Sequence, residues 1–183
     1  MTDLTTRLQS LRSMIMTALF AALAAALGFA LVEIPNVELI TFTVFMAGVL
    51  LGVRSGLLVG LIGEGLFSGL NPLGSGLAIP PLFLAQIISF ALIGAVGGLI
   101  GKRLVRLPFW VIGLTGALLT LFYELLAALA TVLVFGVGEQ GLLAYLILGI
   151  PWSAIHLGLN FIVFAFLSRP VIRLIGSRAE VAR

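Results

Sequence analysis

The sequence predicts an all-α integral membrane protein with six transmembrane helices, of which the second and third are short, and with both termini in the cytoplasm. Hydrophobic residues make up 61% of the 183 positions and charged residues only 9%, whereas a soluble domain carries about 25% charged residues. The mean hydropathy is +1.28, and the apolar residues form long segments of the length that crosses a bilayer as a helix. The alternating polarity of a transmembrane β-barrel is absent.

We expect one transmembrane domain over residues 1–183. Each span should be helical, because lipid cannot satisfy the open edges of a sheet. Polar or Gly/Pro-rich loops separate several of the spans, as in NPLGSGLAIP (71–80), KRLVRLP (102–108) and FGVGEQG (135–141). The predicted spans, to within a few residues, are 13–32, 40–54, 55–70, 81–101, 109–135 and 142–168.

The segment 40–70 is either one helix of 31 residues or two short helices that turn at Arg54. If it turns, every Lys and Arg lies on one side of the membrane, which the positive-inside rule identifies as the cytoplasm. If it does not, Arg54 is buried in the bilayer at a cost of roughly 2.5–3.5 kcal/mol. We therefore predict two helices, each about 22 Å long. The cytoplasmic side then receives Arg7, Arg12, Arg54, Lys102, Arg103, Arg106, Arg169, Arg173, Arg178 and Arg183, and the outer side Glu33, Glu38 and Glu139.

Small residues recur every four positions in two segments. Gly48, Gly52, Gly56 and Gly60 form one series, which Gly65 and Gly69 repeat. Small residues at this spacing allow helix backbones to approach closely in lipid. The first span carries a similar stripe, with Ala21 and Ala25 beside it, and this stripe either packs inside the protein or faces a partner protein. Its members are Ala18, Ala22, Ala26 and Ala30.

Several polar side chains fall inside the apolar spans, where ionisable residues are costly and therefore candidates for function. Trp152, His156 and Asn160 follow one another at intervals of four, so they share one helix face. Buried Glu64 and Glu124 would need a proton, a cation or a hydrogen-bond donor. With their neighbours and two loop residues, the candidate ligand-binding residues are Glu64, Gln86, Tyr123, Glu124, Trp152, His156, Asn160, Asn36 and Asn71.

Most of these residues also have a structural interpretation. Gln86 and Asn160 can form hydrogen bonds to neighbouring helices, and Trp152 can anchor the chain at the membrane interface. His156 can be an interior histidine whose hydrogen bonds are satisfied within the protein. Pro151 should kink the last span just before Trp152 and open space for a ligand.

Three classes of function fit a chain of this kind. One is a binding subunit for a small molecule, in which Trp152 and Tyr123 stack on a ring and the carboxylates bind its polar groups. A second is a proton-coupled carrier that works alone, since buried Glu and His suit proton relays. The least favoured is an intramembrane metal-dependent enzyme, because H-E-x-x-H is absent. No P-loop is present either, so ATP hydrolysis would require a partner subunit.

Five segments stand out in their order along the chain: MTALFAALAAALGFA (16–30), IPNVELITF (34–42), GVLLGVRSGLLVGLIGEG (48–65), NPLGSG (71–76) and PPLFLAQIISFALIGAVGGLIGK (80–102). With these segments the sequence resembles, over nearly the whole chain, the substrate-binding S component of energy-coupling factor (ECF) vitamin transporters.

This resemblance implies a high-affinity binding subunit for a vitamin or related micronutrient in the plasma membrane of a prokaryote. The ligand would lie under loops 33–39 and 71–80. Ala18, Ala22 and Ala26 would dock on a membrane scaffold subunit that carries two ATPases, although Ala21 and Ala25 fit the same pattern. No cofactor is expected in this chain, because only the partners use ATP, and no nucleic acid is expected, because the basic residues lie at span ends. Two carboxylates and one histidine favour a neutral or cationic heterocycle over a dicarboxylate.

Overall fold

The computed structural model describes residues 2–136 and 141–181, and its regular elements are all helices, with no strand in these residues. The all-α prediction is confirmed. Glu139 and Arg183 lie outside the described residues. The elements are α1 (Thr2–Leu31), α2 (Ile40–Leu51), α3 (Val53–Gly69), the 3₁₀ helix η1 (Gly76–Ala78), α4 (Pro80–Ile100), the 3₁₀ helix η2 (Gly101–Arg106), α5 (Phe109–Phe135) and α6 (Gly141–Val181).

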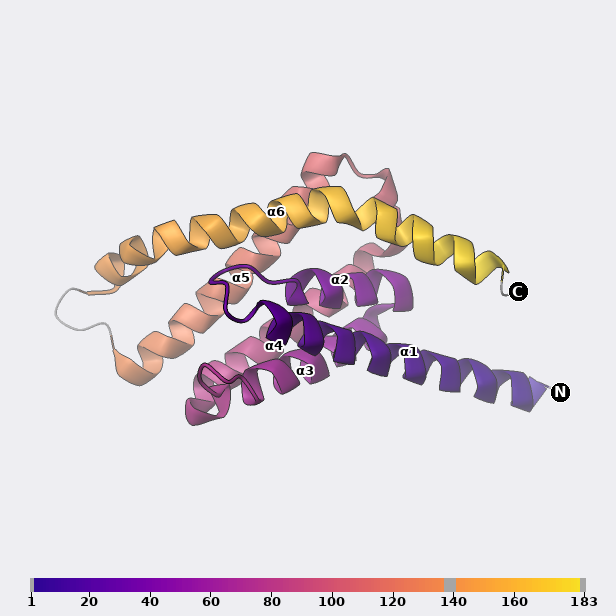
Figure 1. Cartoon of the computed structure of the whole chain (residues 1–183), viewed down its shortest axis with the longest axis horizontal. Coiled ribbons are helices and arrows are strands. Elements are labelled where there is room, and N and C mark those ends of the chain that lie inside the picture. The colour runs from indigo at the N-terminus through magenta and orange to yellow at the C-terminus, as the bar shows by residue number, and fades with distance from the viewer. Residues whose placement is uncertain (1, 137–140, 182–183) are drawn as a thin grey trace.

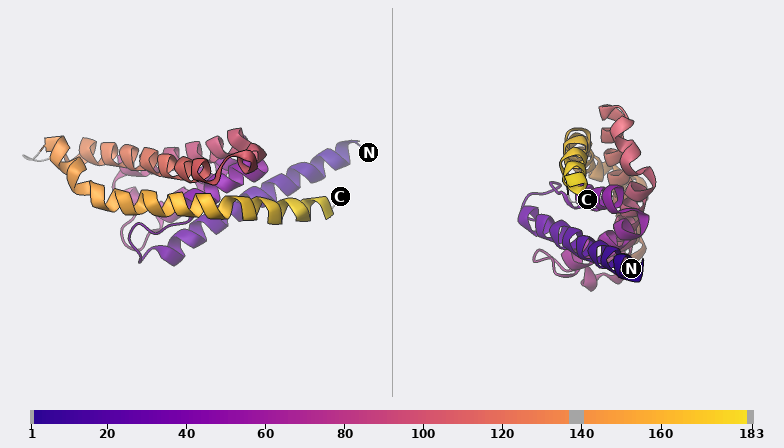
Figure 2. Two further views of the ribbon diagram at one scale, coloured as in Figure 1. Left: turned by 90° about the horizontal axis from the view of Figure 1, so that it is seen from above. Right: turned by 90° about the vertical axis from the view of Figure 1, so that its right-hand side faces the viewer.

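The helices lie roughly along one long axis (Figure 1). Helix α1 begins and helix α6 ends at the same end of the molecule, and the turn between α2 and α3 points towards that end (Figures 1 and 2). The loop between α1 and α2 and the loop that contains η1 point the other way (Figure 1). The cations near the start of α1, at the start of α3 and near the end of α6 are therefore separated from these two loops.

The segment 40–70 folds as two helices, as predicted, and the break lies at Gly52 rather than at Arg54. Gly52 has a φ of +94°, a conformation that only glycine adopts without strain. The chain reverses there, since a Cβ on Gly56 would lie 2.6 Å from the Cα of Gly48 on the preceding helix. With 12 and 17 residues, α2 and α3 are about 18 and 25 Å long.

Glycines bring α2, α3 and α4 into backbone contact. A Cβ on Gly48 or on Gly56 would collide with the carbonyl oxygen of Gly94, and one on Gly60 with that of Phe90. The predicted close approach is therefore present for this part of the series. It does not extend to Gly65, where the nearest atom to an added Cβ, on Ile87, would be 3.8 Å away at an ordinary contact distance.

Four helical segments are long and apolar enough to cross a membrane, judged by length and composition among the described residues. They are Thr5–Leu31, Pro80–Arg106, Phe109–Phe135 and Leu143–Ile175. Large apolar side chains such as Leu99, Leu133 and Leu148 are exposed along them, as expected for surfaces in contact with lipid. Helices α1 and α6 extend beyond the predicted spans 13–32 and 142–168. Helix α2 is instead the centre of the bundle, where Phe45 packs on Phe164 of α6 with ring centroids 5.0 Å apart.

The two alanine patterns of α1 lie on different faces. Ala21 and Ala25 are buried, and a Cβ on Gly63 of α3 would lie 3.1 Å from the Cβ of Ala24 on the same buried face. The other stripe is exposed in this chain, and its members are Ala18, Ala22, Ala26 and Ala30.

Candidate ligand-binding site

A cavity of about 680 Å³ lies between α5 and α6, beside the loop that follows α1. Asn36 borders it from the loop, Trp152 lines it with 58% of its surface exposed, and Tyr123, Glu124 and His156 form a polar border. Helix α6 runs through Pro151 without interruption and bends in its first part (Figure 2), as proline within a helix causes. The polar and aromatic lining residues are Asn36, Tyr123, Glu124, Thr131, Tyr145, Trp152, Ser153 and His156.

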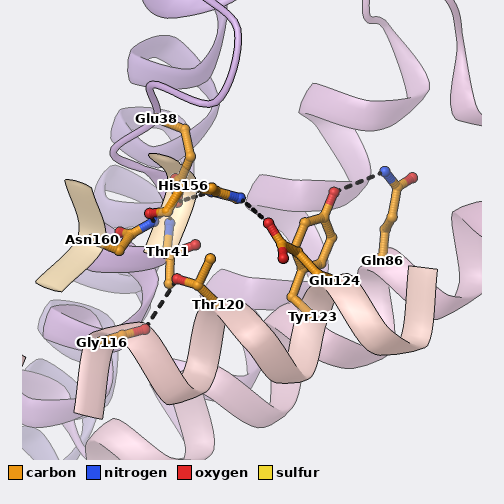
Figure 3. Close-up of polar contacts among 9 residues, drawn as sticks. All are labelled: Glu38, Thr41, Gln86, Gly116, Thr120, Tyr123, Glu124, His156 and Asn160. Atoms are coloured by element: carbon orange, nitrogen blue, oxygen red, sulfur yellow. Dashed lines mark hydrogen bonds and ion pairs between the residues drawn. The ribbon is translucent and has the colours of Figure 1, made fainter. Parts of the chain in front are cut away.

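His156 lies at the centre of a buried polar group, between two carboxylates (Figure 3). Its Nδ1 is 2.9 Å from Oε1 of Glu124 on α5, and its Nε2 is 3.3 Å from Oε1 of Glu38 in the α1–α2 loop. Asn160, one turn further along α6, donates from Nδ2 to the same Glu38 oxygen at 2.9 Å. The face of α6 that the spacing predicted is thus joined both to α5 and to the loop. We call Glu38, His156 and Glu124 the carboxylate–histidine triad.

Glu38 is the residue that ties the loop to the helices. Its Oε2 accepts a hydrogen bond from the backbone N–H of Thr41 at 2.8 Å, at the start of α2, where a free N–H and the helix dipole favour a carboxylate. Desolvation alone would raise the pKa of Glu38, but the hydrogen bonds from His156 and Thr41 outweigh it, so the pKa lies below its ordinary value of 4.5.

A second set of contacts continues the polar group towards α4. Nε2 of Gln86 donates to the hydroxyl of Tyr123 at 3.4 Å (Figure 3), and Oε1 of Gln86 accepts from Ser68 of α3 at 2.7 Å. The ring of Tyr123 stands edge-on to His156 with centroids 6.3 Å apart. Gln86 therefore holds the hydroxyl of Tyr123 from the side of α4 and does not line the cavity.

Hydrogen-bond acceptors are in excess in this part of the molecule. Among the described residues, several buried side-chain oxygens have no hydrogen-bond partner, and buried polar atoms are normally paired. Those in or beside the polar group are Thr41 Oγ1, Glu64 Oε2, Glu124 Oε2 and Asn160 Oδ1. The carboxylate and amide oxygens can only accept, whereas the hydroxyl of Thr41 can also donate, so unpaired acceptors outnumber unpaired donors here.

The structure brings together seven of the nine predicted ligand residues around the cavity or the triad. Asn36, with a φ of 60° that asparagine tolerates, lines the cavity from the loop. Others are Gln86, Tyr123, Glu124, His156 and Asn160, all joined by the contacts above. Trp152 also lines the cavity but makes no contact with the triad that the structure records.

Two predicted residues lie apart from the cavity. Glu64 is buried in α3, 2% exposed, where Glu38 acts on it electrostatically. Asn71 lies at the start of the loop before α4, and its Oδ1 accepts a hydrogen bond from the N–H of Leu73 at 2.9 Å. That bond belongs to a turn, which is a common role of asparagine.

The sequence did not identify Glu38 as a site residue. Its position in the loop indicated only a residue on the outer side of the membrane. One signal was present, because Glu38 stands three positions before Thr41, and a carboxylate just before a helix caps free N–H groups. Its contact with residues of α6 depends on tertiary folding and cannot be inferred from spacing along the chain.

A metal centre is not apparent in the part of the chain that the structure describes, where no cluster of three His, Asp or Glu side chains could hold an ion. In the structure Glu124 meets His156, whereas Glu64 lies apart on α3.

A bundle with apolar outer surfaces and a cavity bordered by a few polar groups is typical of a membrane protein that binds a small molecule. A model of the family described as "ECF transporter, substrate-specific component" matches residues 12–168. The chain belongs to this family and is a multi-pass membrane protein. The family comprises substrate-binding subunits of transporters and is not a family of enzymes. No curated protein and no solved structure matches the chain.

Proposed function

We propose that this protein is the high-affinity binding subunit for uptake of a vitamin or a related small nitrogen heterocycle, and that it works with a separate ECF scaffold subunit and two ATPases. The observation that carries the proposal is the cavity between α5 and α6, whose polar border is made by Tyr123, Glu124 and His156. Its volume, about 680 Å³, falls within the roughly 300–1,000 Å³ of small-molecule sites.

The lining favours an aromatic ligand that donates hydrogen bonds. Trp152 exposes its ring along the wall, where a flat ligand can stack. Glu124 Oε2 is a free acceptor beside the cavity. No Lys or Arg is found among the described lining residues, so a ligand carboxylate would lack a charged partner. A neutral or cationic heterocycle therefore fits better than an acidic one.

We place the chain in the plasma membrane of a prokaryote with six spans and both termini in the cytoplasm. The common end of α1 and α6 would face inward, because the cations gather towards it. The α1–α2 loop and the cavity would then face outward, where a nutrient arrives. The buried position of α2 supports a span as short as 12 residues, since neighbouring helices rather than lipid surround it.

The exposed stripe of Ala18, Ala22 and Ala26 is our candidate for the scaffold-docking surface. These side chains are exposed, whereas Ala21 and Ala25 are buried in internal packing. Small exposed side chains permit another helix to approach closely in lipid.

Native mass spectrometry of the purified protein tests the proposed function. We expect a co-purified small heterocycle, which then serves as the ligand in binding assays. Glu124→Gln combined with His156→Ala should weaken its binding roughly 10- to 100-fold, because hydrogen bonds to charged groups are lost. Asn71→Ala is the matched control and should bind normally. Unchanged affinity in the double variant would remove the proposed pocket.

A proton-coupled carrier that works alone is the alternative, and the carboxylate–histidine triad is the observation that favours it, since such chains relay protons in transporters. Uptake by vesicles that contain only this protein, driven by a pH gradient and without ATP, would establish the carrier. Uptake that requires the scaffold and ATPases would establish the binding subunit.

A further inference from the structure

His156 makes contacts that fix the number of protons in the carboxylate–histidine triad. Both of its ring nitrogens lie within hydrogen-bond distance of carboxylate oxygens, Nδ1 at 2.9 Å and Nε2 at 3.3 Å. An ionised carboxylate can only accept, and a neutral imidazole has one N–H. With a single proton, one of these contacts would bring two lone pairs together in a site where His156 is only 6% exposed.

Two hydrogen bonds among three groups therefore require two protons, which gives the triad a net charge of −1. The natural form is an imidazolium between two carboxylates. The imidazolium is the only positively charged group in this arrangement, and it lies against the cavity.

The groups packed around the triad are two donors to Glu38, one further carboxyl group, an aromatic ring and two unpaired acceptors. Asn160 on α6 and Thr41 on α2 donate to Glu38, and Glu64 on α3 repels it. Tyr123 on α5 faces the imidazole edge-on. Glu124 Oε2 and Asn160 Oδ1 remain buried acceptors without donors, and Asn160 is only 1% exposed. These unpaired acceptors would stabilise an additional positive charge.

We propose that the space between Glu38 and Glu124 is a site for a planar organic cation, and that the imidazolium of His156 is its resident occupant. This rests on the proposed function and narrows the substrate to a cationic nitrogen heterocycle. Such a ligand donates to Glu124 from the cavity and replaces the contact from His156 Nδ1, which releases its proton to water through the cavity, while Nε2 keeps its hydrogen bond to Glu38. The ligand brings one positive charge and one proton leaves, so the charge of the site stays at −1.

The resident cation can be observed directly, because His156 is the only histidine of the chain. Nuclear magnetic resonance of ¹⁵N-histidine-labelled protein then gives the signals of a single ring without assignment. We expect both nitrogens to be protonated at about pH 7.5, above the ordinary histidine pKa of about 6.5. In Glu124→Gln the second proton should be lost, whereas in Asn71→Ala it should remain. A neutral ring in the wild-type protein at this pH would overturn the proposal.

The class of occupant can be tested with imidazole itself. His156→Ala should lower the thermal midpoint, and added imidazole should restore most of the loss at about pH 5.5, where imidazole is a cation, but not at about pH 8.5, where it is neutral. Equal restoration at both pH values would show that a neutral ring suffices and would overturn the cation class, as would no restoration in a folded variant. If the variant does not fold, the wild-type resonance experiment decides.

These results are independent of the test of the proposed function. A neutral His156 would refute the cation site while a co-purified vitamin still supported the binding subunit. An imidazolium in a protein that retains no ligand and takes up nutrients without partners would refute the binding subunit alone.

Discussion

At the scale of single residues, Glu38 joins three parts of the chain through one carboxylate. It contacts the start of α2 through Thr41 and contacts α6 through His156 and Asn160. The interval of four residues predicted that Trp152, His156 and Asn160 would share a helix face, because helical geometry is local. The partner of that face could not be predicted in the same way, since a loop residue is placed by contacts between distant segments.

The depressed pKa of Glu38 predicts how stability depends on pH. A carboxylate whose pKa is lower in the folded state adds stability above its ordinary pKa of 4.5, and this contribution is lost as the pH falls through the folded-state value. The thermal midpoint of the wild-type protein should therefore drop as the pH is lowered below 4.5. Glu38→Gln should have a lower midpoint at neutral pH and a smaller drop on acidification. Parallel curves for the two proteins would show that Glu38 is not the group responsible.

At the scale of helices, the glycine series illustrates what spacing can and cannot predict. Intervals of four predicted close helix contacts, and Gly48, Gly56 and Gly60 make them. Gly65 continues the same interval but meets only a side chain at an ordinary distance. Spacing identifies a face of the helix, but the depth at which a neighbour crosses that face depends on the packing of the bundle.

Gly94→Ala should destabilise the protein, because the added Cβ would collide with the backbone of Gly56. Overpacking of this kind costs roughly 1–3 kcal/mol. Gly65→Ala is the matched control, since it adds the same atom to a glycine of the neighbouring helix at a place with room. Thermal unfolding in detergent compares the two, and equal midpoints would show that the backbone contact contributes little.

The outward stripe of α1 leads to a separate prediction about assembly. Ala22→Leu should abolish or strongly reduce uptake by the complete transporter, because a bulky side chain would prevent close approach of the proposed scaffold subunit, while ligand affinity should stay unchanged. Ala154→Leu, on an exposed position of α6, serves as the control and should support normal uptake. Normal uptake by Ala22→Leu would mean that the scaffold docks elsewhere.

At the scale of the whole molecule, the distribution of cations predicted the most about the fold. Placing every Lys and Arg on one side required the chain to turn near residue 54, and the turn is present at Gly52. The positive-inside rule could not predict the exact position of the turn, because the rule depends on charges in loops and not on the conformation of a single glycine. It also could not predict that α2 would be enclosed by other helices.

The orientation in the membrane can be tested with single cysteines, since the natural chain has none. Val53→Cys, at an exposed position beside the turn, should react with an impermeant thiol reagent only after the membrane is opened. Pro72→Cys, in the exposed loop before α4, should react in intact cells. The reverse pattern, or a residue 53 sealed in lipid, would contradict the six-span topology and the outward-facing cavity.

The backbone contacts among α2, α3 and α4 have a consequence for gating. Helices α2, α3 and α4 are in direct backbone contact, so they have little room to move relative to one another. We therefore expect the motion that admits a ligand to occur in α5 and α6. These two helices reach past the rest of the bundle on the side of the cavity (Figure 1). The distance between spectroscopic labels on α3 and α6 should change as ligand enters, while the distance between labels on α3 and α4 should stay constant.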